Sequence, residues 1–309
     1  MGQQGFYIIS DAEEQALDLP SGKYDVPLAL TSKIYNSDGS LNYDTFHNTG
    51  LWGDVIEVNG QPWPYFSVEP TKYRLRLLNG AISRTFSISF REGDGDDGDI
   101  LDFDVIASDG GLFEHPVHTS DITIATAERY EIIIDFSNHT NQNITMRNLH
   151  GIGDNIDYAA TDQVMRFVVG SSSATASNSV PRNLRKDIPV APSTSVTKDF
   201  EFARDPNGLW LINGVGFADV EHRILTRPEN GEDEIWILRN GPGGGTHPVH
   251  IHLIDFKILS RKGGRGIVEP YESAGWKDVV WLAAGEEVQV VARYAPWPGV
   301  FMFHCHDMG

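Results

Sequence analysis

A short sequence pattern occurs twice in this chain of 309 residues. Residues 58–63 (Val-Asn-Gly-Gln-Pro-Trp) resemble residues 212–217 (Ile-Asn-Gly-Val-Gly-Phe). Each copy is followed by an alternating apolar and polar run that ends in Asn-Gly, at Asn79 and at Asn240, and then by another strand-like run. Because a repeated pattern of this kind indicates one structural unit present twice, we expect two similar domains.

Both halves of the chain are dominated by short runs of β type. Segments rich in Val, Ile, Phe and Tyr alternate with clusters of Gly, Asn, Asp and Pro, which is typical of strands joined by turns. The clearest runs are 73–78, 86–90, 130–136 and 288–292. Many short strands with frequent turn signals favour an all-β chain built as two β-sandwiches.

Composition suggests where the domains end. Residues 170–179 are mostly Ser, Ala and Gly, and the polar, proline-containing stretch after them is typical of a linker. We therefore expect one domain over 23–170, a linker over 171–197 and a second domain over 198–309. Residues 1–22 are interpreted as the tail of an earlier domain and its connector.

The only cysteine, Cys305, lies between His304 and His306, after the apolar strand-like run 299–303. Neighbouring side chains of an extended strand point to opposite faces. Cys305 is therefore expected to face one way and the two histidines the other. A thiolate flanked by two imidazoles can then take part in two metal sites, with the backbone as a short covalent path between them.

Three further histidines, His247, His250 and His252, form a second cluster upstream. His250 and His252 share one strand face, while Pro248 restricts His247 to an extended or turn conformation. Thiolate and imidazole together suit copper, and two His with one Cys form the blue-copper pattern. The alternative is that these are ordinary core or surface histidines. It is weakened because five of the eleven histidines lie in two short windows, one of which contains the sole cysteine.

The tetrapeptide His115-Pro-Val-His118 repeats residues 247–250 without the third histidine two residues later. It also has no His-Cys-His partner in its own half of the chain. We interpret it as a structural turn that binds no metal.

Charge and composition exclude several kinds of partner. With 24 basic and 43 acidic residues, the net charge is −19, which argues against binding to nucleic acid. No stretch is long and apolar enough to span a bilayer, so no membrane association is expected. The N-terminus lacks the features of a signal peptide. Two glycosylation sequons, at Asn138 and Asn143, favour a secreted parent protein.

The chain resembles the multicopper oxidases, and among them the fungal enzymes of the bilirubin oxidase type. The resemblance extends over essentially the whole chain and corresponds to the later part of such an enzyme. It rests mainly on residues 247–252 and 304–306, and further on residues 51–63, 270–273, 277–281 and 294–299.

This resemblance implies two cupredoxin-like Greek-key domains, a middle one without copper and a C-terminal one with copper ligands. It implies that His247 and Cys305 bind type 1 copper, that His250 binds type 2 copper, and that the type 3 pair is bound by His252, His304 and His306. The implied activity is oxidation of phenolic or pyrrolic substrates, one electron at a time, with reduction of dioxygen to water. Electrons would pass through Cys305 to its two neighbouring histidines.

The chain also departs from the family pattern. No His-X-His motif precedes residue 250, whereas the family's first domain supplies two, and the second type 1 histidine would follow Gly309. Residue 245 is Gly where bilirubin oxidases carry Trp. We therefore expect a truncated chain, inactive alone, that lacks an N-terminal cupredoxin domain, while the complete enzyme is extracellular. Two alternatives remain open: a non-enzymatic cupredoxin-like protein with residual copper binding, and a chain that pairs with a separate first domain.

Overall fold

The computed structural model describes residues 4–42, 50–95, 97–171, 179–242 and 245–306. The chain forms two compact units, and the change from unit 1 to unit 2 falls between Ile188 and Pro189. The finer domain limits that the sequence suggests stay predictions. In the described residues, no helix is long and apolar enough to cross a membrane.

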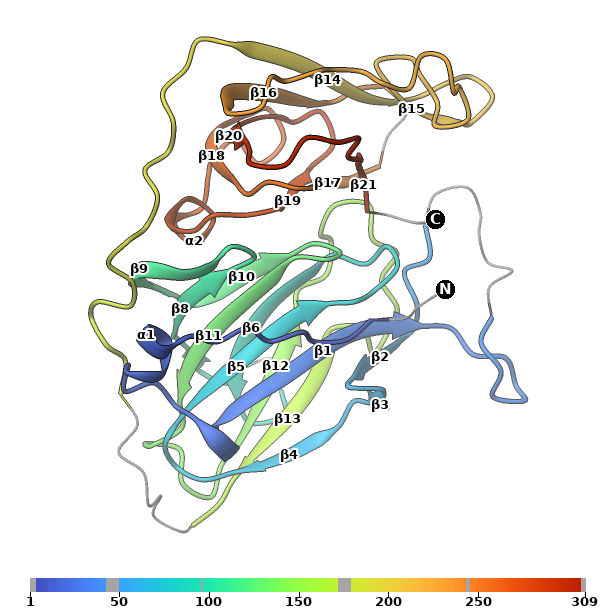
Figure 1. Cartoon of the computed structure of the whole chain (residues 1–309). Coiled ribbons are helices and arrows are strands. Elements are labelled where there is room, and N and C mark those ends of the chain that lie inside the picture. Colours follow the sequence, from blue (N-terminus) through green and yellow to red (C-terminus); the bar gives the residue numbers. More distant parts are fainter. Residues whose placement is uncertain (1–3, 43–49, 96, 172–178, 243–244, 307–309) are drawn as a thin grey trace. The chain divides into compact units, whose positions relative to one another are not determined.

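Unit 1 contains two large β-sheets (Figure 1). In spatial order, the first consists of β3 (Gln61–Pro62), β2 (Val55–Val58), β1 (Asp25–Lys33), β5 (Lys72–Asn79), β11 (Arg129–Asp135), β8 (Phe103–Ser108) and β9 (Gly111–Thr119). The second consists of β10 (Asp121–Ile124), β6 (Phe86–Glu92), β12 (Asn143–Asn148), β13 (Gln163–Val169) and β4 (Tyr65–Val68), with β7 (Ile100–Leu101) paired to β6.

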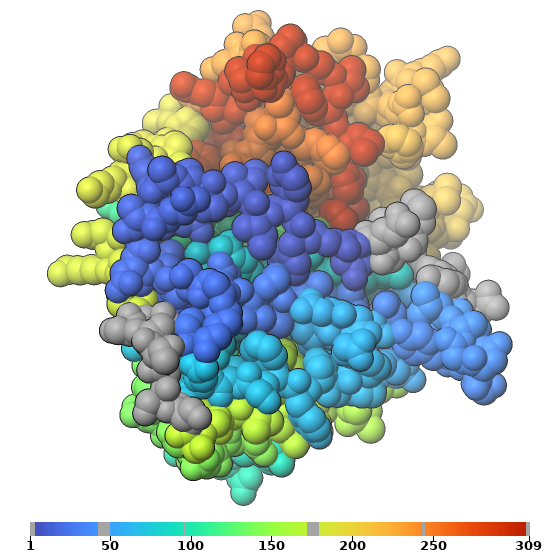
Figure 2. Space-filling model, turned by 60° about the horizontal axis from the view of Figure 1, so that its bottom comes forward, coloured from blue at the N-terminus to red at the C-terminus, as the bar shows by residue number. Residues whose placement is uncertain are grey.

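The N-terminal segment lies on the outside of unit 1, where Figure 2 shows it in blue. It includes the short helix α1 (Ala12–Gln15) and the 3-10 turn η1 (Gly22–Tyr24). The Asp11 side chain caps α1 by accepting a hydrogen bond from the Glu14 N–H at 2.8 Å. Glu14 in turn pairs with Arg74 of β5 at 2.8 Å, so an ion pair ties this segment to the first sheet.

Unit 2 also contains two sheets. The larger is ordered β15 (Trp210–Ile212), β14 (Thr197–Arg204), β16 (Glu232–Asn240), β20 (Glu287–Tyr294) and β18 (Phe256–Lys262). The smaller is ordered β19 (Val279–Leu282), β17 (His247–Ile251) and β21 (Phe303–Cys305), and the short helix α2 (Pro270–Ala274) follows β18.

A buried apolar core joins the two sheets of unit 2. Phe200, Trp236 and Phe303 meet there, with ring centroids 4.5 to 5.0 Å apart. Val249 and Val280, which belong to the smaller sheet, are fully buried in the same core. Each such side chain stabilises the fold by about 1.5–3 kcal/mol when fully buried. The core thus holds β17 firmly against the larger sheet.

The repeat noticed in the sequence is also present in the hydrogen bonds. Asn59 and Asn213 both adopt a left-handed conformation, with φ of 53° and 52°. The side-chain oxygen of Asn59 accepts from the Ala29 N–H at 2.8 Å, and that of Asn213 accepts from the Glu201 N–H at 2.7 Å. These two turns, with the same conformation and the same kind of side-chain hydrogen bond, support the interpretation of one unit present twice.

The all-β prediction is confirmed: three of the four runs chosen as the clearest strands lie within β5, β6 and β20, and the run 130–136 lies in β11 except for Phe136. Two local predictions are wrong. Residues 299–302 are not in a strand, because β17 ends at Ile251 and its pairing with Phe303 is the last of that ladder. The His115–His118 tetrapeptide lies in strand β9 rather than a turn, because Val117 pairs with Val105 of β8.

Candidate metal centre

Strand β17 lies between β19 and β21. Two of the six predicted ligands, His247 and His250, belong to this strand, and a third, His252, follows its last residue. His250 pairs directly with His304 of β21, and Val249 pairs with Cys305. Two backbone hydrogen bonds flank this ladder: the His252 N–H donates to Met302 O at 3.0 Å, and the His306 N–H donates to Pro248 O at 2.6 Å. The register therefore places the two clusters side by side.

The first pair of predicted ligands consists of His247 and Cys305. Its members are diagonal neighbours across the β17–β21 ladder, and the His247 Nδ1 atom lies 3.4 Å from Cys305 Sγ. A tetrahedral ion with bonds of about 2.0 Å to nitrogen and 2.3 Å to sulfur would hold such ligands roughly 3.5 Å apart. The observed separation thus fits two ligands of one metal ion.

His247 is deeply buried, with only 3% of its surface exposed. Its ring lies between Phe202, at a centroid distance of 5.7 Å, and Trp210, at 4.8 Å in an edge-to-face arrangement. Burial lowers the pKa of His247 to about 4, so the ring is neutral at neutral pH and keeps a nitrogen lone pair free to bind a metal. Its Nε2 atom has no hydrogen-bond partner among the described residues.

The other four histidines gather on the opposite face of the same strands. The His250 ring centroid lies 4.7 Å from that of His252, 5.6 Å from that of His304 and 6.1 Å from that of His306. The Nε2 atoms of His252 and His304 are 3.2 Å apart. Two imidazoles bound to one tetrahedral ion would place their nitrogens at a similar separation, roughly 3.3 Å. The four rings are partly buried rather than open to solvent.

Backbone carbonyls fix the tautomers of two of these rings. His250 Nδ1 lies 2.8 Å from Asp278 O, and His304 Nδ1 lies 2.9 Å from Cys305 O. A carbonyl oxygen only accepts, so Nδ1 must carry the proton in both rings. In neutral rings this leaves each Nε2 with its lone pair. Metal-binding histidines usually donate their second N–H to a carbonyl or carboxylate in this way.

Electrostatics favour the neutral form of two of these rings, His252 and His306. Burial, followed by the neighbouring His250 and His304, lowers the pKa of His252. Burial, followed by the nearby His304, lowers the pKa of His306. Neutral imidazole is the form that binds metal ions, so both groups are held in the competent state.

All six predicted ligands are therefore brought together, as a His–Cys pair and a face of four histidines. Within the described part of the chain, however, no group of three or more His, Cys, Asp or Glu side chains is arranged to hold a metal ion by itself. The Nδ1 atom of His118 instead lies 3.0 Å from Asp104 Oδ1 in unit 1, in keeping with a structural role for that histidine.

Sequence reasoning missed the residues around His247. Phe202 and Trp210 precede it by a long stretch of chain and come from the larger sheet, so no local pattern links them to the ligand. Asn240 was noticed only as a landmark of the repeat, although its side chain contacts the backbone beside His247.

Comparison with known proteins agrees with this architecture. A family profile described as multicopper oxidase matches residues 10–166, just over half of the chain, and a second profile with the same description matches residues 187–308. The chain belongs to the multicopper oxidase family. The donor set described above, one cysteine sulfur with five imidazoles, fits the copper that this family binds.

Individual relatives support the same assignment. The chain is 50% identical to bilirubin oxidase from Albifimbria verrucaria over 99% of its length, which is 55% of that protein. It is 32% identical to a laccase from Bacillus subtilis (strain 168), covering 99% of this chain and 64% of the laccase. The crystal structure of the McoA multicopper oxidase from the hyperthermophile Aquifex aeolicus superposes with a TM-score of 0.82 at 30% identity, covering 96% of this chain and 65% of that one.

These matches confirm both the predicted family and the cupredoxin-like fold. They also show that the chain spans a little over half to about two thirds of the length of these relatives.

Proposed function

We propose that this chain is the copper-binding part of a copper-dependent oxidoreductase. The complete enzyme oxidises phenolic or pyrrolic substrates one electron at a time and reduces dioxygen to water. The observation that carries this proposal is the division of six ligands over two faces of one small sheet, with Cys305 between the two histidines of the second face.

Each ligand has a proposed role. His247 and Cys305 would hold type 1 copper, His250 type 2 copper, and His252 would join His304 and His306 at the type 3 pair. When bound there, copper supplies one-electron redox chemistry and the reduction of dioxygen.

The surrounding residues prepare these ligands. Burial keeps His247 neutral, and the Phe202 and Trp210 rings limit the access of water to it. The carbonyls that accept from His250 and His304 hold those rings in one tautomer and orientation. The Cys305 backbone joins the two faces through covalent bonds, which provides a short path for electrons.

The proposed reaction has two small-molecule partners, a reducing substrate and dioxygen. Four one-electron oxidations of a small reducing substrate, with four protons, convert one dioxygen molecule into two water molecules. We propose that an additional N-terminal cupredoxin domain supplies further histidines to the four-histidine face. We also propose that the complete enzyme is extracellular, which the sequons at Asn138 and Asn143 support.

Copper loading tests the proposal. The 309-residue chain should gain a thiolate-to-copper absorption band that disappears in Cys305→Ser and persists in the control His250→Ala. Oxidation of phenols should be slight for the chain alone and substantial once the chain is joined to the upstream domain and downstream ligands of a relative. Lack of the band, or full turnover by the chain alone, would contradict the proposed ligand roles and favour the non-enzymatic alternative or a different site.

A further inference from the structure

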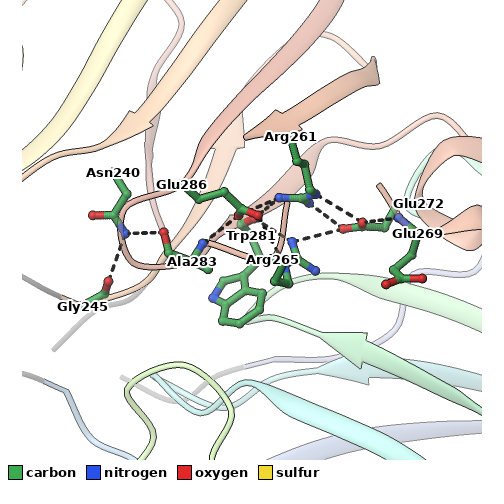
Figure 3. Close-up of polar contacts among 9 residues, drawn as sticks. All are labelled: Asn240, Gly245, Arg261, Arg265, Glu269, Glu272, Trp281, Ala283 and Glu286. Atoms are coloured by element: carbon green, nitrogen blue, oxygen red, sulfur yellow. Dashed lines mark hydrogen bonds and ion pairs between the residues drawn. The ribbon is translucent and has the colours of Figure 1, made fainter. Parts of the chain in front are cut away.

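Asn240, the last residue of β16, is buried, and its amide group joins two backbone segments (Figure 3). The Nδ2 atom donates to Gly245 O at 3.0 Å and to Ala283 O at 2.9 Å. Both contacted atoms are carbonyl oxygens, so the NH₂ end of the amide must face them. One side chain thus satisfies two buried acceptors.

The two carbonyls lie immediately beside the first ligand. Gly245 precedes His247 by two residues, and Ala283 directly follows Leu282, the cross-strand partner of His247. The Asn240 amide therefore connects β17 and β19 just beyond the His247–Leu282 pair. A shift of either segment would move the His247 ring relative to Cys305.

A buried ion network holds the Ala283 end of this connection. The Ala283 N–H donates to Glu286 Oε2 at 2.9 Å, and the same oxygen accepts from Arg261 Nη1 at 2.9 Å. The side chains of Arg261 and Glu286 are fully buried. Figure 3 shows this network extending from Asn240 through Glu286 to Arg261 and Glu272.

We infer that Asn240 is a positioning residue for the thiolate copper site. Its amide fixes the backbone of both strands at the end of the His247–Leu282 pair and so maintains the 3.4 Å separation of His247 Nδ1 from Cys305 Sγ. This inference rests on the proposed function, because it concerns the same site. Residues that hydrogen-bond a metal ligand directly typically change metal affinity by about 10–100-fold when removed, and Asn240 acts one step further out, through the backbone, so the lower end of this range is expected.

Unit 1 provides a matched control. Asn79 ends β5 and donates through Nδ2 to Arg84 O at 2.8 Å and Ile124 O at 2.9 Å. Its backbone N–H donates to Glu128 O at 3.2 Å, as that of Asn240 donates to Glu286 O at 2.9 Å. Asn79 makes the same kind of connection in the unit that carries none of the six proposed ligands.

The experiment compares Asn240→Ala, Asn240→Ser and Asn79→Ala in the whole chain. The metal-free readout is the alkylation rate of Cys305, which is specific because the chain has one cysteine. The copper readouts are the thiolate absorption band, its electron paramagnetic resonance spectrum and the copper affinity of that site. Urea unfolding measures the structural cost of each variant.

We expect Asn240→Ala and Asn79→Ala both to lower the urea midpoint, Asn79→Ala somewhat more because its Oδ1 also accepts from the Ala81 N–H at 2.9 Å. Only the Asn240 variants should alkylate faster, shift the copper spectra and weaken copper binding at the thiolate site, by roughly tenfold for Asn240→Ala. Asn240→Ser, which keeps one hydroxyl donor, should show the same changes to a smaller extent, because it can donate to only one of the two carbonyls. It also preserves the test if the alanine variant fails to fold.

Two outcomes would overturn the inference, and they are distinguishable. If the wild-type chain shows the thiolate band and the Asn240 variants match Asn79→Ala in the alkylation rate and in the copper readouts, Asn240 has a structural role only. If the wild-type chain shows no thiolate band, the proposed function itself fails, and the positioning role fails with it.

Discussion

Replacing Arg261 with Met should destabilise unit 2 strongly. The Arg261 guanidinium is fully buried and pairs with Glu272 at 2.6 Å and with Glu286 at 2.9 Å. It also donates to Trp281 O at 2.8 Å. Met fills much of the same volume but leaves both carboxylates without their main cation.

The expected size follows from these contacts. Removing one partner of a buried ion pair costs about 3–5 kcal/mol, because an uncompensated charge remains in the interior. Arg265 would still lie 3.4 Å from Glu272 and 3.6 Å from Glu286, which compensates part of the loss. We therefore expect a cost at the lower end, about 3 kcal/mol.

Arg239→Met is the matched control in the same unit. Arg239 pairs with Asp199 at 2.8 Å and also with Glu287, but its side chain is 40% exposed. Exposed ion pairs contribute only about 0–1 kcal/mol, so this variant should be nearly neutral.

Urea unfolding followed by tryptophan fluorescence provides the assay. Most of the tryptophans lie in unit 2, namely Trp210, Trp236, Trp276, Trp281 and Trp297. With a slope of about 2 kcal/mol per molar urea, Arg261→Met should lower the midpoint by roughly 1.5 M and Arg239→Met by less than about 0.5 M. Equal midpoints for the two variants would refute the argument that burial makes the Arg261 network important.

Two further predictions concern histidines in the metal-free chain, each measured by a nuclear magnetic resonance titration. Trp210→Ala should raise the pKa of His247 from about 4 towards 6.5, because removing the covering ring hydrates the imidazole; an unchanged pKa would mean that Trp210 does not contribute to its burial. The pKa of His118 should lie above 6.5, because the hydrogen bond to Asp104 stabilises the protonated ring. Any stabilisation of the fold by this contact is therefore complete below pH 6.5 and is lost as the pH rises through the raised pKa. Asp104→Asn should lower that pKa, and a midpoint insensitive to the substitution would show that the contact is absent in solution.

The strand character and the division of the ligands could be predicted from sequence because both follow from local rules. Side chains alternate along any strand, so Cys305 had to face away from His304 and His306 once the segment was extended. The same alternation separates His247 from His250, and both residues lie within β17 with no turn at Pro248. The two Asn-Gly turns that begin at Asn59 and Asn213 are likewise short motifs whose conformation depends on local preferences.

The remaining features depend on contacts between residues far apart in sequence. Nothing near Trp210 or Phe202 indicates that they enclose His247, since the packing of the two sheets decides this. The hydrogen bonds of the Asn240 amide could not be predicted from the sequence either, because its two acceptors are backbone carbonyl oxygens, which every residue has. The start of β21 at Phe303 depends on where β17 ends, which the apolar run before Phe303 does not reveal.

The most direct test of the account is the ligand environment of copper in this chain, measured by X-ray absorption. The account predicts a sulfur neighbour at one copper population and only nitrogen or oxygen neighbours at the others, because strand alternation separates Cys305 from the four-histidine face. Cys305→Ser should remove the sulfur signal and retain copper bound by nitrogen. A sulfur neighbour that depends on His250 or His252 instead of His247 would contradict the proposed division of the ligands.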